Sequence, residues 1–328
     1  SSEVVHSGIY NPPEFLKSKL CLKGRKLLYE YCEKNRIFYK NCGKIIISGK
    51  NEKNTLLKLY ELGNTKGLNE MKILNREEIQ KLEPSINADL GLLIKETGII
   101  DSHSLMNSFY SNSIKANHDY LFVTAVQNVF YDELKYRIFL KTMNYEQEES
   151  VTAKWVINAA GLQSDSIFKM LVGESSEPNL YFSKGNYFSL SSSWRNNFKH
   201  LIYPLPEKNH QSLGVHITFD KSGNVRLGPD SCVIKNKVED YTVDEKLIDK
   251  FYLEASKYIS GLNKEDLSPD YTGIRPKILS SDTNASDFYI CHEISKGYKG
   301  WINLIGIESP GLTSCLSIAE MVTDWISD

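Results

Sequence analysis

A strand, a glycine turn and a helix are encoded by the stretch Trp301-Ile-Asn-Leu-Ile-Gly306-Ile-Glu-Ser-Pro310-Gly311-Leu-Thr-Ser-Cys-Leu-Ser-Ile-Ala-Glu320-Met-Val-Thr-Asp-Trp325. The apolar run 301–305 predicts a buried strand, and Pro310-Gly311 predicts a turn into a helix. The first N–H groups and positive dipole end of such a helix favour an anion or a polarised carbonyl. An ordinary strand-to-helix connection is the alternative. We expect the buried stripe of the helix to be Leu312, Cys315, Leu316, Ala319, Val322 and Ile326.

The overall composition favours a small molecule as the partner. The 328 residues carry a net charge of −2, and 24% are charged. This balance gives no electrostatic footprint for nucleic acid or an anionic membrane. The six cysteines form no C-x-x-C pair, so we expect neither a metal site nor disulfides. No apolar run approaches the roughly 18 residues of a transmembrane segment.

A second strand with small residues at its end lies in the middle of the chain. The segment 153–165 reads Ala-Lys-Trp-Val-Ile-Asn-Ala-Ala-Gly-Leu-Gln-Ser-Asp, which predicts a buried strand, a glycine turn and a helix cap. Small residues such as Ala160 and Gly161 allow a ligand to approach the backbone closely. The opening segment Ser2-Glu-Val-Val-His6-Ser-Gly8-Ile-Tyr10 has the same small, hydroxyl-bearing character.

These three segments resemble parts of the FAD-dependent oxidoreductases of the D-amino-acid oxidase superfamily, in the branch of L-2-hydroxyglutarate dehydrogenase. The phrase Gly306-Ile-Glu-Ser-Pro-Gly-Leu-Thr-Ser314 carries the resemblance most specifically, and the likeness extends over essentially the whole chain. It implies that FAD is the cofactor. The residues implied to contact FAD are Ser2, His6, Gly8, Val126, Ala160, Gly161, Ser309, Gly311, Leu312 and Thr313.

The resemblance also implies the fold. We expect an α/β chain, with a glutathione-reductase-like FAD-binding domain formed by 1–36, 98–175 and 270–328. Segments 37–97 and 176–269 are expected to form an α+β substrate domain on a mixed, largely antiparallel sheet. The family opens with a βαβ unit and a G-x-G-x-x-G turn, but the first glycine here is Gly8. We therefore expect a chain that is truncated or processed and that binds FAD weakly or not at all.

The substrate-binding residues are likewise implied by the resemblance. Gly273-Ile-Arg275-Pro276 is similar to a family phrase whose arginine holds the substrate carboxylate, a task that suits the planar guanidinium fork. The candidates for a distal carboxylate are Lys184, Tyr187 and Tyr203. Alternation over 213–219 predicts that His216 leaves the apolar face of a strand. His216 is the first candidate for the catalytic base, and His6 is the second.

The function implied is oxidation of a 2-hydroxy dicarboxylic acid, L-2-hydroxyglutarate, to 2-oxoglutarate, with the hydride passing from C2 to flavin N5. Two alternatives stay open: an amino-acid or amine oxidase that shares Arg275 and the terminal loop, and a non-catalytic remnant that acts as a binding protein. The wording of several segments suggests a eukaryotic, mitochondrial protein, with a cytoplasmic location or one peripheral to a membrane as the alternative. The electron acceptor could be a quinone, a carrier protein or oxygen.

Three further elements are predicted from periodicity alone. A strand is expected over 120–126, followed by a hairpin over 130–143. A long helix is expected over 241–259.

Overall fold

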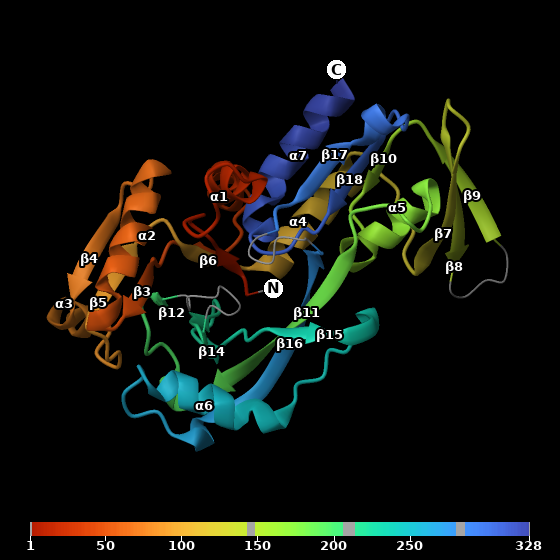
Figure 1. Cartoon of the computed structure of the whole chain (residues 1–328). Helices are drawn as coiled ribbons and strands as arrows, with labels where there is room; N and C mark the ends of the chain where they lie inside the picture. The colour runs from red at the N-terminus through yellow and green to blue at the C-terminus, as the bar shows by residue number, and fades with distance from the viewer. Residues whose placement is uncertain (1, 143–147, 206–213, 280–285, 328) are drawn as a thin grey trace.

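The computed structural model describes residues 2–142, 148–205, 214–279 and 286–327 (Figure 1). The helices are α1 (Leu16–Lys34), α2 (Lys53–Thr65), α3 (Arg76–Leu82), α4 (Ser102–Lys115), α5 (Ser164–Val172), α6 (Ile248–Ser256) and α7 (Gly311–Ser327). The strands are β1 (Val4–Val5), β2 (Tyr39–Lys40), β3 (Lys44–Ser48), β4 (Met71–Asn75), β5 (Leu90–Ile94), β6 (Gly98–Ile100), β7 (Thr124–Tyr131), β8 (Tyr136–Thr142), β9 (Glu148–Ala153), β10 (Val156–Asn158), β11 (Leu180–Leu190), β12 (Leu201–Pro204), β13 (Ile217–Phe219), β14 (Val225–Leu227), β15 (Cys232–Ile234), β16 (Leu267–Ile278), β17 (Tyr289–His292) and β18 (Trp301–Ile305).

The largest sheet is mixed and mostly antiparallel, as expected. Its strands lie in the order β15-β11-β14-β13-β12-β3-β5-β4, and β16 pairs with β11. The pairing of β12 with β3 is parallel, whereas the other pairings in this sheet are antiparallel. Strand β3 is buried along its whole length, which suits its run of β-branched isoleucines. Helix α6 covers one end of the sheet, where Phe251 packs on Phe188 with ring centroids 4.6 Å apart (Figure 1).

A second, smaller sheet contains the strand predicted from Trp301. Strands β10 and β18 are parallel, with Asn158 opposite Asn303, and β17 is antiparallel to β18. The buried Trp301 packs against Tyr136, with ring centroids 5.3 Å apart. Because β10 and β18 are parallel neighbours, the turns that follow them lie at the same edge of the sheet.

Helices α1 and α7 pack closely through small residues. A Cβ atom added to Gly24 would lie 2.5 Å from the Thr313 carbonyl oxygen and 2.8 Å from the Ser314 Cα. The Ser317 hydroxyl donates to the Leu20 carbonyl at 2.7 Å. Because of this contact, the buried face of α7 differs from the expected one. Ala319 and Ile326 are exposed, whereas the buried residues are Thr313, Ser314, Ser317, Ile318 and Val322.

Three boundaries differ from the sequence-based expectation. Strand β7 begins only at Thr124, because the positive φ of +56° at Val123 interrupts extended backbone, and it then forms the hairpin with β8. The helix expected over 241–259 is a short 3₁₀ turn, Glu245–Leu247, followed by α6. Asp244 caps that turn by accepting from the Lys246 N–H, which fixes its start. Strand β13 covers only Ile217–Phe219 of the range expected over 213–219, and residue 213 lies outside the described residues.

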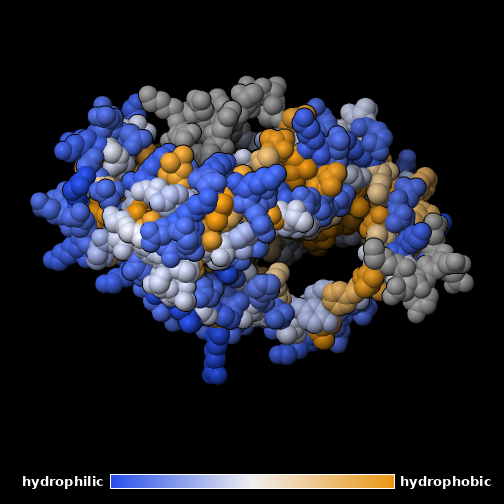
Figure 2. All heavy atoms as spheres, turned by 90° about the horizontal axis from the view of Figure 1, so that it is seen from below, coloured by the Kyte–Doolittle hydropathy of each residue, from blue (hydrophilic) through white to orange (hydrophobic). Residues whose placement is uncertain are grey.

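The three-stranded β7-β8-β9 sheet projects from one side of the body (Figure 1). Figure 2 shows the molecule from below, with hydrophobic residues beside an opening next to this sheet. The division of the chain into cofactor and substrate segments stays a prediction. Strand β2 pairs with β6, and β16 extends across residue 270, so both elements lie at the predicted boundaries.

Candidate functional site

The turn between β18 and α7 meets the opening segment of the chain. The His6 backbone N–H donates to the Thr313 hydroxyl at 3.0 Å, and the His6 Nε2 atom lies 3.2 Å from the Ser309 hydroxyl. Helix α7 begins at Gly311, so the positive end of its dipole is directed at this corner. The half-buried Leu312 packs against the cluster that contains Leu28 and Cys32 of α1. The structure thus brings His6, Ser309, Gly311 and Thr313 together.

His6 sits in an environment that keeps its imidazole neutral. Burial lowers the pKa of His6 to about 3, and the charge of Lys44 adds to this effect. A neutral imidazole has one nitrogen that accepts a proton. So low a pKa nevertheless makes His6 a weak base at neutral pH.

The turn after β10 lies at the same sheet edge and has room for a bulky ligand. Ala160 and Gly161 are exposed. Gly161 has a φ of +58°, and an added Cβ would meet nothing within 4 Å. The Asn158 amide donates to the Asn303 side-chain oxygen at 2.9 Å and ties this strand to β18. An open glycine turn beside a helix N-terminus fits a dinucleotide such as FAD.

The other residues implied to touch FAD are spread over the opening segment and β7. Gly8 is buried with a φ of +83°, and the Lys66 ammonium holds its carbonyl oxygen at 2.8 Å. Ser2 is hydrogen-bonded to Tyr187. Val126 is half-buried on β7, where it packs against the Trp301 cluster. The contacts of Ser2, Gly8 and Val126 with FAD stay predictions.

Arg275 is fixed against strand β11. It lies opposite Ser183 in the β11–β16 register. Its Nη1 and Nη2 atoms donate to the Asp230 carbonyl oxygen at 3.4 and 3.3 Å. Nη2 lies 2.6 Å from the position that a Cβ of Gly185 would occupy, so this glycine creates the space for the guanidinium. The fork is therefore positioned by backbone contacts before any ligand binds.

Several aromatic rings lie near Arg275. Tyr187 stacks on Tyr271 with centroids 4.4 Å apart, and the pKa of Tyr187 is raised by burial while the charge of Arg275 opposes that rise. Tyr203 stacks on His216 with centroids 3.6 Å apart. Tyr203 is also near enough to Tyr187 for its charge to contribute to a raised pKa of Tyr203, although burial is the main cause. Arg275, Tyr187, Tyr203 and His216 therefore lie near one another, and we call this group the aromatic wall.

Two expectations for this wall need correction. His216 was expected to leave the apolar face of its strand; it is buried, with an exposed fraction of 3%, and its ring stacks on Tyr203. Lys184 is not brought together with Arg275. It pairs across the sheet with Ile274, on the face opposite that of Arg275, and its ammonium forms an ion pair with Asp240 at 2.9 Å.

The structure adds residues that the sequence pattern did not single out. Lys44, at the start of β3, is buried with its ammonium 4.5 Å from the centre of the Tyr10 ring and 4.8 Å from that of Tyr203. A lysine directly before the run Ile45-Ile-Ile47 was the available signal, because lysine is almost never fully buried without a reason. Tyr271, two residues before the Gly273 phrase, is the other residue that the sequence did not single out.

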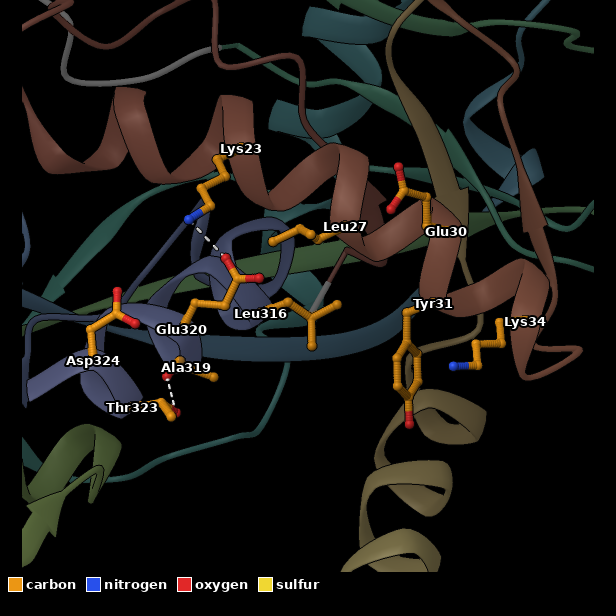
Figure 3. A pocket seen from close by; sticks show the side chains of 10 residues that line it. All are labelled: Lys23, Leu27, Glu30, Tyr31, Lys34, Leu316, Ala319, Glu320, Thr323 and Asp324. Carbon is orange, nitrogen blue, oxygen red and sulfur yellow. Dashed lines mark hydrogen bonds and ion pairs between the residues drawn. The ribbon is translucent and has the colours of Figure 1, made fainter. Parts of the chain in front are cut away.

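A surface groove of about 680 Å³ lies elsewhere, between α1 and α7 (Figure 3). Its lining includes Leu27 and Leu316 together with the ion pair between Lys23 and Glu320 at 2.8 Å. No residue predicted for cofactor or substrate lines it, so it bears on neither. Within the described residues, no cluster of three or more His, Cys, Asp or Glu side chains could hold a metal ion. No helix among the described residues is long and apolar enough to cross a membrane.

Comparison with known proteins identifies the family. The family model described as "FAD dependent oxidoreductase" (DAO) matches residues 1–325. The chain belongs to this family. It is 36% identical to the mitochondrial L-2-hydroxyglutarate dehydrogenase of Arabidopsis thaliana over 99% of this chain and 74% of the relative. It is 30% identical to the enzyme of the same name from Pongo abelii over 99% of this chain and 76% of the relative.

The solved structures agree on the fold of this oxidoreductase. The L-α-glycerophosphate oxidase of Mycoplasma pneumoniae with FAD bound superposes with a TM-score of 0.88 and 20% identity, over 100% of this chain and 84% of that one. The expected α/β fold, the enzyme class, the FAD cofactor and the resemblance to L-2-hydroxyglutarate dehydrogenase are thereby confirmed. FAD would be held at the Gly161 turn and at the corner formed by His6, Ser309 and Gly311.

Proposed function

We propose that this oxidoreductase converts L-2-hydroxyglutarate to 2-oxoglutarate. The observation that supports this most is the position of Arg275, whose fork lies beside Tyr187 in the aromatic wall that includes Tyr203 and His216. This wall offers a carboxylate ligand and a proton acceptor together. The names of the relatives from Arabidopsis thaliana and Pongo abelii support the choice of substrate.

Each residue in this proposal has one task. Arg275 binds the C1 carboxylate through two parallel hydrogen bonds and so orients C2. An imidazole nitrogen accepts the hydroxyl proton as the C2–H bond breaks. When bound, FAD supplies the acceptor for the hydride that leaves C2. The pKa of His6, lowered to about 3, favours His216 over His6 as the base.

Turnover by the FAD-loaded protein tests the proposal. L-2-hydroxyglutarate should reduce an artificial electron acceptor, and 2-oxoglutarate should accumulate in equal amount. Glycine and sarcosine are the comparison substrates, because an amine-oxidising member of the family would share Arg275 and the terminal loop. Turnover of these amines without turnover of L-2-hydroxyglutarate would exclude the proposal.

We further propose that the protein acts in mitochondria, because the relatives carry that word in their names. A membrane quinone or a carrier protein is the proposed physiological acceptor. Comparing rates with a soluble quinone, an electron-transferring flavoprotein and oxygen would rank these acceptors. Oxygen as the fastest acceptor would contradict this part of the proposal.

A further inference from the structure

We propose that Lys44 binds the second carboxylate of the substrate, and that it thereby makes the site selective for dicarboxylic over monocarboxylic 2-hydroxy acids. The inference rests on the proposed function, because it assigns a residue to one end of the proposed substrate. In this role Lys44 takes the place of Lys184, which lies on the opposite face of the sheet from Arg275.

Lys44 is a buried lysine whose side chain contacts aromatic rings. Its exposed fraction is 1%, and its neighbours across the sheet are Leu201 and Ile94. Among the described residues, no ion pair of its ammonium is found, and its contacts are with two aromatic rings. Burial of an unpaired ammonium is costly. Contact with the rings of Tyr10 and Tyr203, at 4.5 and 4.8 Å, offsets only part of that cost.

A second group without a partner lies at the same place. The Tyr10 hydroxyl is buried and, in the part of the chain that the structure describes, makes no hydrogen bond. A carboxylate has two oxygens, which could accept from the Lys44 ammonium and from this hydroxyl at the same time. One ligand of this kind would satisfy both groups.

Lys44 and Arg275 lie near the same group of aromatic side chains, and we therefore assign one carboxylate of the proposed substrate to each. Lys44 contacts Tyr203, and Tyr203 is electrostatically coupled to Tyr187, which lies beside Arg275. The two cations are therefore found beside the same aromatic wall. Arg226 lies near the same wall, 5.6 Å from the Tyr271 ring, but it is already held by Asp220 and Asp270.

The rival role for Lys44 is that of the proton acceptor. Burial lowers the pKa of Lys44 to about 7, so a neutral amine is available near neutral pH. The two roles predict different effects on substrates with and without a second carboxylate. A base affects every substrate alike, whereas a carboxylate ligand affects only substrates that carry the second carboxylate.

Equilibrium binding separates these roles without depending on turnover. The FAD-loaded protein would be titrated calorimetrically with glutarate and with pentanoate, which lacks the second carboxylate. The wild type should prefer glutarate, and Lys44→Met should reduce that preference by roughly 30-fold or more, as expected for one partner of a desolvated charge pair. Lys44→Arg should keep part of it. Lys72→Met, an exposed strand lysine paired with Glu78, is the matched control and should behave as wild type.

A measurement on the wild type tests the inference even if the Lys44→Met variant does not fold. Binding of an anion raises the pKa of Lys44, so glutarate but not pentanoate should cause proton uptake near pH 8. The titratable groups that face Lys44 among the described residues are His6, Tyr10, Cys21 and Tyr203. None of these titrates near pH 8, because the pKa of His6 is about 3, that of Cys21 about 12, and burial raises those of the two tyrosines.

The outcomes are separable from those of the turnover assay. An unchanged preference for glutarate in a folded Lys44→Met variant, or its loss in Lys184→Met instead, would overturn the inference. Absence of proton uptake by the wild type would do the same. If Lys44 controls the preference but L-2-hydroxyglutarate is not oxidised, only the proposed substrate fails.

Discussion

Arg275 is held by contacts that depend on the shape of a guanidinium. Its fork lies over Gly185 and donates to the Asp230 carbonyl through both terminal nitrogens. Lysine carries the same charge but lacks the planar fork. We expect Arg275→Lys and Arg275→Ala to lower kcat/KM for L-2-hydroxyglutarate about 30- to 5000-fold, since a desolvated charge pair costs about 2 to 5 kcal/mol when broken.

The control for this prediction is the flavin content of each variant. Arg275 is placed on the substrate sheet, so FAD absorbance and thermal unfolding should stay at wild-type values. A lysine variant with wild-type kcat/KM would show that Arg275 does not bind substrate. Loss of FAD from either variant would point to a structural role instead.

The low pKa of His6 predicts that replacing the two histidines has different effects. A general base contributes roughly 10²- to 10⁴-fold to the rate. His216→Ala should therefore reduce kcat by that factor, whereas His6→Ala should reduce it less because the pKa of His6 is already about 3. The measurement is the rate of flavin reduction by L-2-hydroxyglutarate in rapid mixing. If His6→Ala is the slower variant, the two roles must be exchanged.

At the scale of single residues, the sequence indicated which residues are candidates for the site better than it indicated where their side chains point. The phrase around Gly273 singled out Arg275, and the terminal phrase singled out Ser309 and Thr313, because short motifs preserve local geometry. The orientation of Lys184 could not be predicted in the same way. It depends on the register between β11 and β16, which is set by pairing with a strand about 90 residues away.

Among the elements, the contact between α1 and α7 makes Gly24 sensitive to substitution. An added methyl group would meet backbone atoms of Thr313 and Ser314, which lie in the turn region expected to hold FAD. We expect Gly24→Ala to lower the free energy of unfolding by about 1 to 3 kcal/mol through overpacking, even though alanine favours helix by about 1 kcal/mol. Urea unfolding would measure the change.

Gly63 in α2 offers a matched helical control. An added Cβ there would meet the flexible end of Met71 at 2.5 Å, which is able to move aside, and would lie 3.2 Å from Ile9 Cδ1. Gly63→Ala should therefore be neutral or stabilise by up to about 1 kcal/mol. Equal effects of the two substitutions would mean that the α1–α7 contact is not tightly packed.

The same contact explains why the α7 stripe was only partly predictable. Periodicity treats Ser314 and Ser317 as polar, but the close approach of the two helices buries both. The Ser317 hydroxyl bonds to carbonyl oxygens of Leu20 on α1 and Ser314 on its own helix. The shortened helix at Ile248–Ser256 has a local cause. Asp244 caps the preceding 3₁₀ turn, so regular helix starts only after it, at Ile248.

For the whole molecule, the buried cations predict how stability depends on pH. Burial lowers the pKa of Lys44 to about 7 and that of Lys66 to about 8, from an ordinary value of 10.5. Above these values the folded chain has released protons that the unfolded chain still binds. The free energy of unfolding should therefore rise with pH from about 7, since stability increases with pH wherever the unfolded state binds more protons. Above pH 9 the buried Cys21 opposes this trend, because its pKa is raised to about 12.

Lys44→Met tests this dependence between pH 7 and 9. One proton contributes a slope of about 1.4 kcal/mol per pH unit at most, and the variant should lose a large part of one such slope. Methionine fills a similar volume without a charge, so the variant should be more stable than the wild type at pH 7, and this advantage should shrink towards pH 9. Lys72→Met, whose ammonium is mostly exposed, should leave the slope unchanged. Urea unfolding at pH 7, 8 and 9 gives the slopes, and parallel lines for wild type and Lys44→Met would mean that Lys44 titrates as an ordinary, solvated lysine.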